Sequence, residues 1–123
     1  MFMSGAPPDF RSEELLASVI VALIGDARHV AVGAASPLPA TAALLARELG
    51  RGRPHVTVLG SRKHDFFSDG GRELFDLAGQ GRLDLFFLSG GQIDGEANVN
   101  LVSTGDYRHP QVRFPGSFGS AYL

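Results

Sequence analysis

The sequence has no cysteine and only one lysine, Lys63, among 123 residues. Without cysteine the chain forms no disulfide, offers no thiol nucleophile and contains no Cys-type zinc site. This absence fits a reducing compartment. The 11 basic residues nearly balance 13 acidic ones, giving a formal net charge of −2. Charge therefore gives no reason to expect binding to nucleic acid or to an anionic membrane.

Long apolar runs are also missing. The longest, residues 15–24, is interrupted by Ser18 and is well short of the ~20 residues that a membrane-spanning helix needs. The N-terminus carries acidic residues where a signal peptide would carry basic ones. We therefore predict a cytoplasmic protein with no membrane segment. The length predicts one domain, residues 12–123, after a flexible N-terminus of residues 1–11.

Helix-like and strand-like patterns alternate over the first 90 residues. Helices are expected from an N-cap at Ser12, from Pro39 and from an N-cap at Asp69, each ending near a glycine. In the second helix, Leu44, Leu45 and Leu49 are expected to face the core. Short apolar runs at residues 29–32, 56–59 and 83–88 are typical of strands. This alternation predicts an α/β fold, an open parallel sheet covered by helices on both faces in three layers.

Glycine follows each of the three predicted strands, at Gly33, Gly60 and Gly90. The carboxyl ends of parallel strands share one edge of a sheet, where ligands usually bind. After the third strand come Gly91, Gln92 and several short polar side chains, with two further short strands expected at residues 99–102 and 112–114. Asp94, Asn98 and Asn100 are equally compatible with ligand binding and with turns held by their own side chains.

Two other motifs are weaker. Residues 88–92 spell LSGGQ, the signature of ABC-type ATPases, but no Gly-Lys phosphate loop exists and the motif follows a strand, so we reject that interpretation. His64 and Asp65 can form an acid–base pair, although a solvated loop is favoured. Ser61 and Ser117 are not in a nucleophile elbow, and the four histidines show no metal-ligand spacing. His29 and His55, at strand starts, are expected to be structural.

A series of motifs in order resembles one family. Gly90-Gly91-Gln92-Ile93-Asp94, Asn98-Val99-Asn100, Gly105-Asp106-Tyr107, His109-Pro110 and Arg113-Phe114 are similar to the β subunits of family I CoA-transferases, the glutaconate enzyme in particular. Weaker similarity at Val30–Gly33 and Pro37-Leu38 extends the resemblance over most of residues 13–120.

The resemblance implies an oligomeric enzyme with an α-type subunit and an acyl-CoA substrate. Coenzyme A is then a substrate, with no permanently bound cofactor or metal. A family glutamate attacks the thioester, forming first an acyl anhydride and then a glutamyl-CoA thioester. Family β subunits also extend beyond the glycine loop at residues 116–119, so residues 12–123 are expected to be a fragment or to have the remainder supplied otherwise.

This chain departs from the family at the nucleophile, because Gly60 stands where the glutamate is expected. Transfer by the covalent route is therefore in doubt, and two alternatives stay open: acyl-CoA hydrolysis on the same fold, or a non-catalytic binding subunit. The final glycine loop also differs, at Phe118 and Ser120. The residues expected to bind substrate or CoA are Gly33, Ser61, Gly90, Gly91, Gln92, Asn98, Asn100, Gly116, Ser117 and Gly119.

Overall fold

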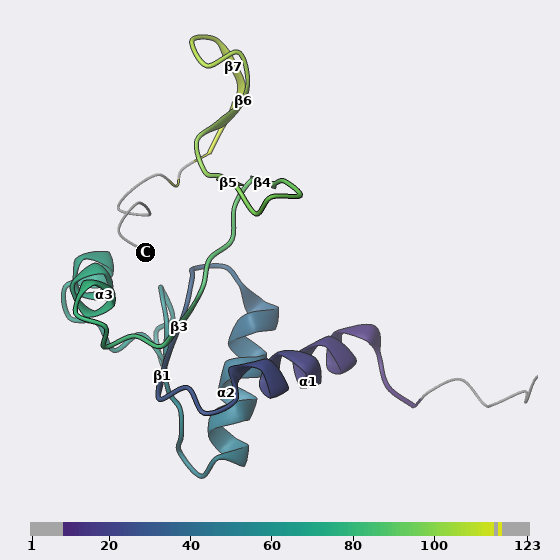
Figure 1. The fold of residues 1–123 in the computed structure, drawn as a ribbon, viewed down its shortest axis with the longest axis vertical. Helices are drawn as coiled ribbons and strands as arrows, with labels where there is room; N and C mark the ends of the chain where they lie inside the picture. The colour runs from purple at the N-terminus through teal and green to yellow at the C-terminus, as the bar shows by residue number, and fades with distance from the viewer. Residues whose placement is uncertain (1–8, 115, 117–123) are drawn as a thin grey trace, which may run out of the picture.

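A computed structural model describes residues 9–114 and residue 116. Its centre is a three-stranded parallel sheet in the order β2-β1-β3, formed by β1 (His29–Val32), β2 (His55–Val58) and β3 (Leu85–Phe87). Helices α1 (Ser12–Ile24) and α2 (Pro37–Leu49) lie on one side of the sheet, and α3 (Gly70–Gly79) lies on the other (Figure 1). The predicted three-layer α/β fold is confirmed.

Beyond the sheet the chain forms two small antiparallel hairpins. The first pairs β4 (Gln92–Ile93) with β5 (Val99–Asn100), and the second pairs β6 (Ser103–Gly105) with β7 (Pro110–Arg113). Figure 1 shows both hairpins rising from the carboxyl end of β3, away from the helices. We call residues 91–113 the hairpin arm. The sequence predicted strands near β5 and β7 but missed β4 and β6.

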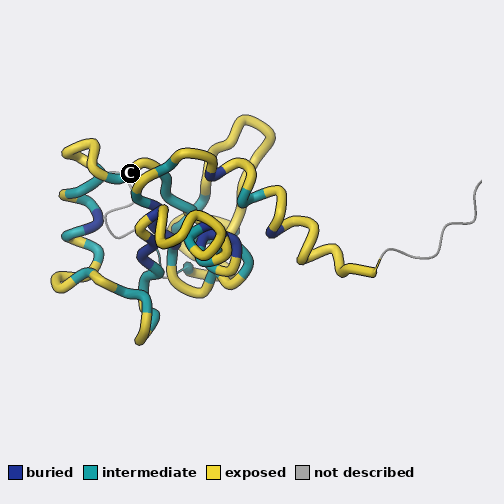
Figure 2. Tube along the Cα trace, turned by 90° about the horizontal axis from the view of Figure 1, so that it is seen from below, coloured by how far each residue is buried: buried dark blue, intermediate teal, exposed yellow. Residues whose placement is uncertain are grey.

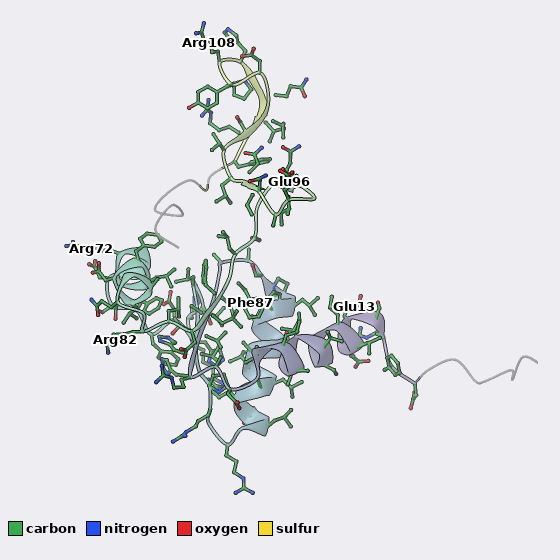
Figure 3. The ribbon with its side chains drawn as sticks, viewed as in Figure 1. Glu13, Arg72, Arg82, Phe87, Glu96 and Arg108 are labelled. Atoms are coloured by element: carbon green, nitrogen blue, oxygen red, sulfur yellow. The ribbon has the colours of Figure 1, made fainter. Side chains whose placement is uncertain are left out.

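Side chains alternate along each strand, so the protein has one set of interior contacts on each face of the sheet. Val30 and Val32 of β1 join Val56 of β2 in a core that packs against α1 and α2. Phe87 of β3 contacts the same core, on the α2 side of the sheet (Figure 3). Because successive strand residues point to opposite faces, Phe86 turns instead toward α3.

The face of α2 that packs on the sheet is made of alanines. Ala42, Ala43 and Ala46 are buried, whereas Leu49 is 69% exposed and Leu45 is also exposed. The expectation that Leu45 and Leu49 face the core was therefore wrong, and only Leu44 packs against it. Small side chains let the helix approach the strands closely, which leaves no room for the two leucines on that face.

The start of α1 also differs from the expectation. Ser12 is the first helical residue and Arg11 is the N-cap. Glu14 reaches back, and its Oε2 accepts the backbone N–H of Arg11 at 2.7 Å. A carboxylate at this position satisfies one of the unpaired amides at the helix start and interacts favourably with the helix dipole. Figure 2 shows that α1, the helix next to the grey N-terminal trace, is largely exposed. Most residues of the two hairpins are exposed as well. No helix within the described residues is long and apolar enough to span a membrane.

The amino edge of the sheet holds the predicted structural histidines. His29 and His55 begin β1 and β2, with ring centroids 4.8 Å apart. The Nε2 of His29 lies 3.4 Å from the Oγ1 of Thr57, which is fully buried. Burial lowers the pKa of His29 below its ordinary value, and the nearby His55 lowers it further, against the opposing effects of a hydrogen bond with the Arg82 backbone and of the charge on Asp84.

We expect stability to fall with acid through His29. Because the pKa of His29 is lower in the folded state, the unfolded chain binds the proton more readily. The free energy of unfolding is therefore highest while this histidine is neutral in both states, and it decreases as the pH falls below about 6.5. Urea unfolding at pH 7.5 and pH 5.5 should therefore show a smaller acid-induced loss in His29→Asn than in the wild type. An equal loss in both proteins would contradict this assignment.

Candidate functional site at the carboxyl edge of the sheet

The glycines after β1 and β2 lie at one edge, as predicted. The N–H of Gly33 donates to the carbonyl oxygen of Phe87 at 3.1 Å, and the N–H of Leu59 donates to Val32 at 2.9 Å. A methyl group placed on Gly33 would lie 3.2 Å from that Phe87 oxygen. Glycine therefore lets β1 and β3 approach closely at the point where the strands open into the candidate site.

A cavity of about 310 Å³ opens at this edge, beneath α3. It is bounded by the ends of all three strands, by α3, by the hairpin arm and by Gly116 of the glycine loop. Its lining residues are Gly33, Ala34, Leu59, Gly71, Leu74, Phe75, Phe86, Leu88, Ser89, Leu101 and Gly116. Two of the predicted binding residues, Gly33 and Gly116, are thus brought together. A larger hollow of about 730 Å³ lies beside Arg28 and Arg53, at the opposite edge and away from the motifs.

Gly60 adopts a left-handed conformation with φ of 76°. This backbone geometry costs a residue with a side chain about 1–2 kcal/mol. Among the described residues, only the Cβ of Ala34 lies within range of an added Cβ, at 4.0 Å. A side chain at this position would therefore fit beside Ala34, which itself lines the cavity.

Asp65 lies against Gly60, although four residues separate them in sequence. Its Oδ2 accepts the N–H of Gly60 at 2.9 Å, and its Oδ1 accepts the N–H of Phe67 at 3.2 Å. The segment turns back on β2, since the N–H of Val58 donates to the His64 carbonyl at 2.9 Å. The sequence named Asp65 as half of a possible acid–base pair with His64, but it did not predict the hydrogen bond to Gly60. Asp65 holds the loop around Gly60.

Ser61 is likewise part of this loop. Its Oγ accepts the N–H groups of His64 at 3.1 Å and of Lys63 at 3.3 Å, and its own N–H donates to Val58. These bonds are those of a turn formed by a serine side chain. The role of Ser61 in binding substrate stays a prediction.

Gly90 and Gly91 allow close packing at the base of the hairpin arm. A Cβ at Gly90 would overlap the Cγ1 of Val99, and one at Gly91 would overlap the ring of Phe114. The two glycines therefore let the chain leave β3 and pass directly under the hairpin. Neither lines the cavity described above.

The amide side chains hold the two hairpins together. Asn100 Nδ2 donates to Gln92 Oε1 and to the Ser103 carbonyl oxygen, both at 2.8 Å. Its Oδ1 accepts the N–H of Val102 at 3.0 Å. Gln92 and Asn100 thus join β4, β5 and the start of β6.

Asn98 serves the turn of the first hairpin in a similar way. Its Nδ2 donates to Asp94 Oδ2 at 2.9 Å, and its backbone N–H donates to Asp94 Oδ1 at 2.9 Å. The Asn98 amide, together with the backbone N–H groups of Asn98 and Glu96, lowers the pKa of Asp94. Glu96 marks the exposed tip of this hairpin (Figure 3). These side chains thus form the turns that the sequence allowed, and the role of Asn98 and Asn100 in binding substrate stays a prediction. Ser117 and Gly119 lie outside the described residues.

Sequence comparison finds a short match in the family that the sequence motifs resemble, the CoA-transferases. Over 34 residues the chain is 56% identical to the β subunit of glutaconate CoA-transferase from Acidaminococcus fermentans, covering 28% of this chain and 13% of the relative. The chain is CoA-transferase β-subunit-like. No family model matches it.

Solved structures extend the similarity over nearly the whole of this chain. The decarboxylase AibA/AibB superposes with a TM-score of 0.72 at 28% identity, over 93% of this chain and 55% of that one. Glutaconate coenzyme A-transferase from A. fermentans gives 0.67 at 25% identity, over 93% and 52%. IpdAB of Rhodococcus jostii RHA1, at 19% identity and a TM-score of 0.66 over 94% and 50%, shares the fold. The chain spans about half the length of these solved chains.

Proposed function

We propose that this chain is the β-like, acyl-CoA-binding component of a CoA-transferase-type enzyme and that it acts with an α-type subunit. The observation that carries the proposal is the cavity at the strand ends, which Gly33 and Gly116 of the family-like motifs line together. The two-component names of AibA/AibB and IpdAB support a second subunit. The expected setting is the cytoplasm, with coenzyme A as substrate.

Gly60 determines which chemistry this chain can contribute. Transfer by the family mechanism needs a carboxylate that attacks the thioester carbon while the C–S bond breaks. The carboxylate of Asp65 accepts a hydrogen bond from Gly60, but its two oxygens are both engaged with backbone N–H groups, of Gly60 and Phe67. We therefore propose that any nucleophile or general base comes from the α-type subunit. Hydrolysis of the acyl-CoA by an activated water is the alternative reaction.

The test is an assay of the two-subunit complex on a panel of acyl-CoA esters with and without carboxylate acceptors. Free CoA released by hydrolysis can be followed with a thiol reagent, to which this chain adds no background because it contains no cysteine. Transfer frees no thiol, so it is followed by chromatographic separation of the new acyl-CoA formed from the acceptor. Acceptor-dependent exchange of CoA would indicate transfer, and acceptor-independent release of CoA would indicate hydrolysis. A folded complex that does neither, while still binding acyl-CoA, would indicate the non-catalytic binding subunit and refute the enzymatic proposal.

A further inference from the structure

The cavity at the strand ends is apolar. None of its described lining residues is ionisable, and among them Ser89 supplies the one polar side chain. Leu59, Leu74 and Phe86 come from the end of β2, from α3 and from β3 respectively. Leu74 is only 1% exposed, so this wall is continuous with the interior of the protein.

Size and position make this cavity suited to one small group. Its volume of about 310 Å³ lies at the lower end of the range of roughly 300–1,000 Å³ typical of ligand pockets. Gly116, from the glycine loop, stands beside Leu101, whose Cδ2 would be 3.9 Å from a methyl group on that glycine. A thioester held near the glycines at the edge would thus direct its acyl chain toward leucine and phenylalanine side chains.

A second carboxylate on the acyl group would fit this environment poorly. An anion transferred from water into an apolar site loses its hydration, and the loss is large unless a cation or hydrogen-bond donors replace it. The described lining provides no cation. A terminal methyl group at the same place would instead gain from leaving water.

We propose that this cavity binds the acyl chain and selects an uncharged, short aliphatic acyl group over a dicarboxylic one. The inference rests on the proposed function and narrows it to a substrate class. It separates the chain from glutaconate CoA-transferase, whose named substrate is a dicarboxylate. Leu59, Phe86 and Leu101 are the side chains expected to determine this specificity.

Valeryl-CoA and glutaryl-CoA form a matched pair for the test, since both carry five acyl carbons and differ by a terminal methyl or carboxylate group. Calorimetry on the full chain, with its α-type subunit if that is needed for solubility, should give valeryl-CoA at least about tenfold tighter binding. Leu101→Arg should reduce or reverse this preference by supplying a cation in the cavity. Val112→Arg, at an exposed site on β7, should leave it unchanged.

The same pair as N-acetylcysteamine thioesters separates this inference from the proposed function. Preference for valeryl in both series supports both. Valeryl preference in the short thioesters, with no binding of any CoA ester, supports the apolar cavity and refutes the CoA assignment. Glutaryl binding equal to or tighter than valeryl binding overturns the selectivity while leaving the CoA assignment intact. Absence of binding in both series overturns both, provided that circular dichroism shows each protein to be folded.

Discussion

Gly60→Glu is expected to acquire a covalent glutamyl-CoA adduct that the wild type does not form, when the two-subunit complex is incubated with an acyl-CoA. The new carboxylate would attack the thioester carbon, and the C–S bond would break to give an acyl–glutamyl anhydride and CoA thiolate. The thiolate would then attack the glutamyl carbonyl carbon, forming the glutamyl-CoA thioester and releasing the acyl group as a carboxylate. The part of the chain that the structure describes leaves room for it, because only the Cβ of Ala34 lies near an added Cβ there, at 4.0 Å. Intact-mass measurement of this chain detects the adduct.

Strain must be separated from chemistry in this experiment. With φ of 76° at Gly60, any side chain should cost about 1–2 kcal/mol of folding free energy. Gly60→Gln carries the same strain and nearly the same shape without the nucleophile, so it should be destabilised equally and form no adduct. A folded Gly60→Glu complex that binds acyl-CoA yet forms no adduct would show that Gly60 is not at the nucleophile position.

The second large effect is expected from Asn100→Ala, which should loosen the hairpin arm. Its side chain donates to Gln92 and to the Ser103 carbonyl at 2.8 Å each, and accepts the N–H of Val102 at 3.0 Å. Removing it leaves partly buried backbone groups without partners, at a cost of about 1–3 kcal/mol for such a group. We expect a loss of about 2–4 kcal/mol in arm stability.

Hydrogen exchange over residues 92–113 measures this effect, with Asn98→Ala as the matched comparison. Asn98 is exposed, and its side chain makes one hydrogen bond to the described residues, to Asp94 at 2.9 Å. Its loss should cost about 0.5–1.5 kcal/mol and affect the first hairpin alone. Equal acceleration of exchange in the two variants would contradict the view that Asn100 joins the hairpins.

Much of the fold follows from patterns that the sequence carries locally. β1 matches the prediction residue for residue, and β2 is shifted by one, because each is a short apolar run between breaking residues. The glycines at the strand ends could also be placed, since parallel strands direct their carboxyl ends to one edge. The prediction of Ser12 as the N-cap was wrong, because the helix begins at Ser12 and the Glu14 side chain accepts the N–H of Arg11, the N-cap residue. Sequence spacing alone does not distinguish this long carboxylate from a serine as the capping group.

Other features depend on contacts that spacing does not encode. The burial of Ala42 and Ala46 in place of Leu45 and Leu49 reflects how closely α2 approaches the sheet. A strand as short as β4, with two residues, is too short to show the alternation of apolar and polar side chains that predicts a strand. The proximity of Asp65 to Gly60 depends on a loop that turns back on β2.

The most direct measurement of the central claim is photolabelling by an acyl-CoA analogue with a diazirine at the end of its acyl chain. If the cavity at the strand ends holds the acyl group, peptide mapping should place the label on residues 59, 74–75, 86–88 or 101, and excess valeryl-CoA should abolish it. Label on the exposed faces of α1 and α2, or label that valeryl-CoA does not displace, would contradict the assignment of this cavity as the acyl-CoA site.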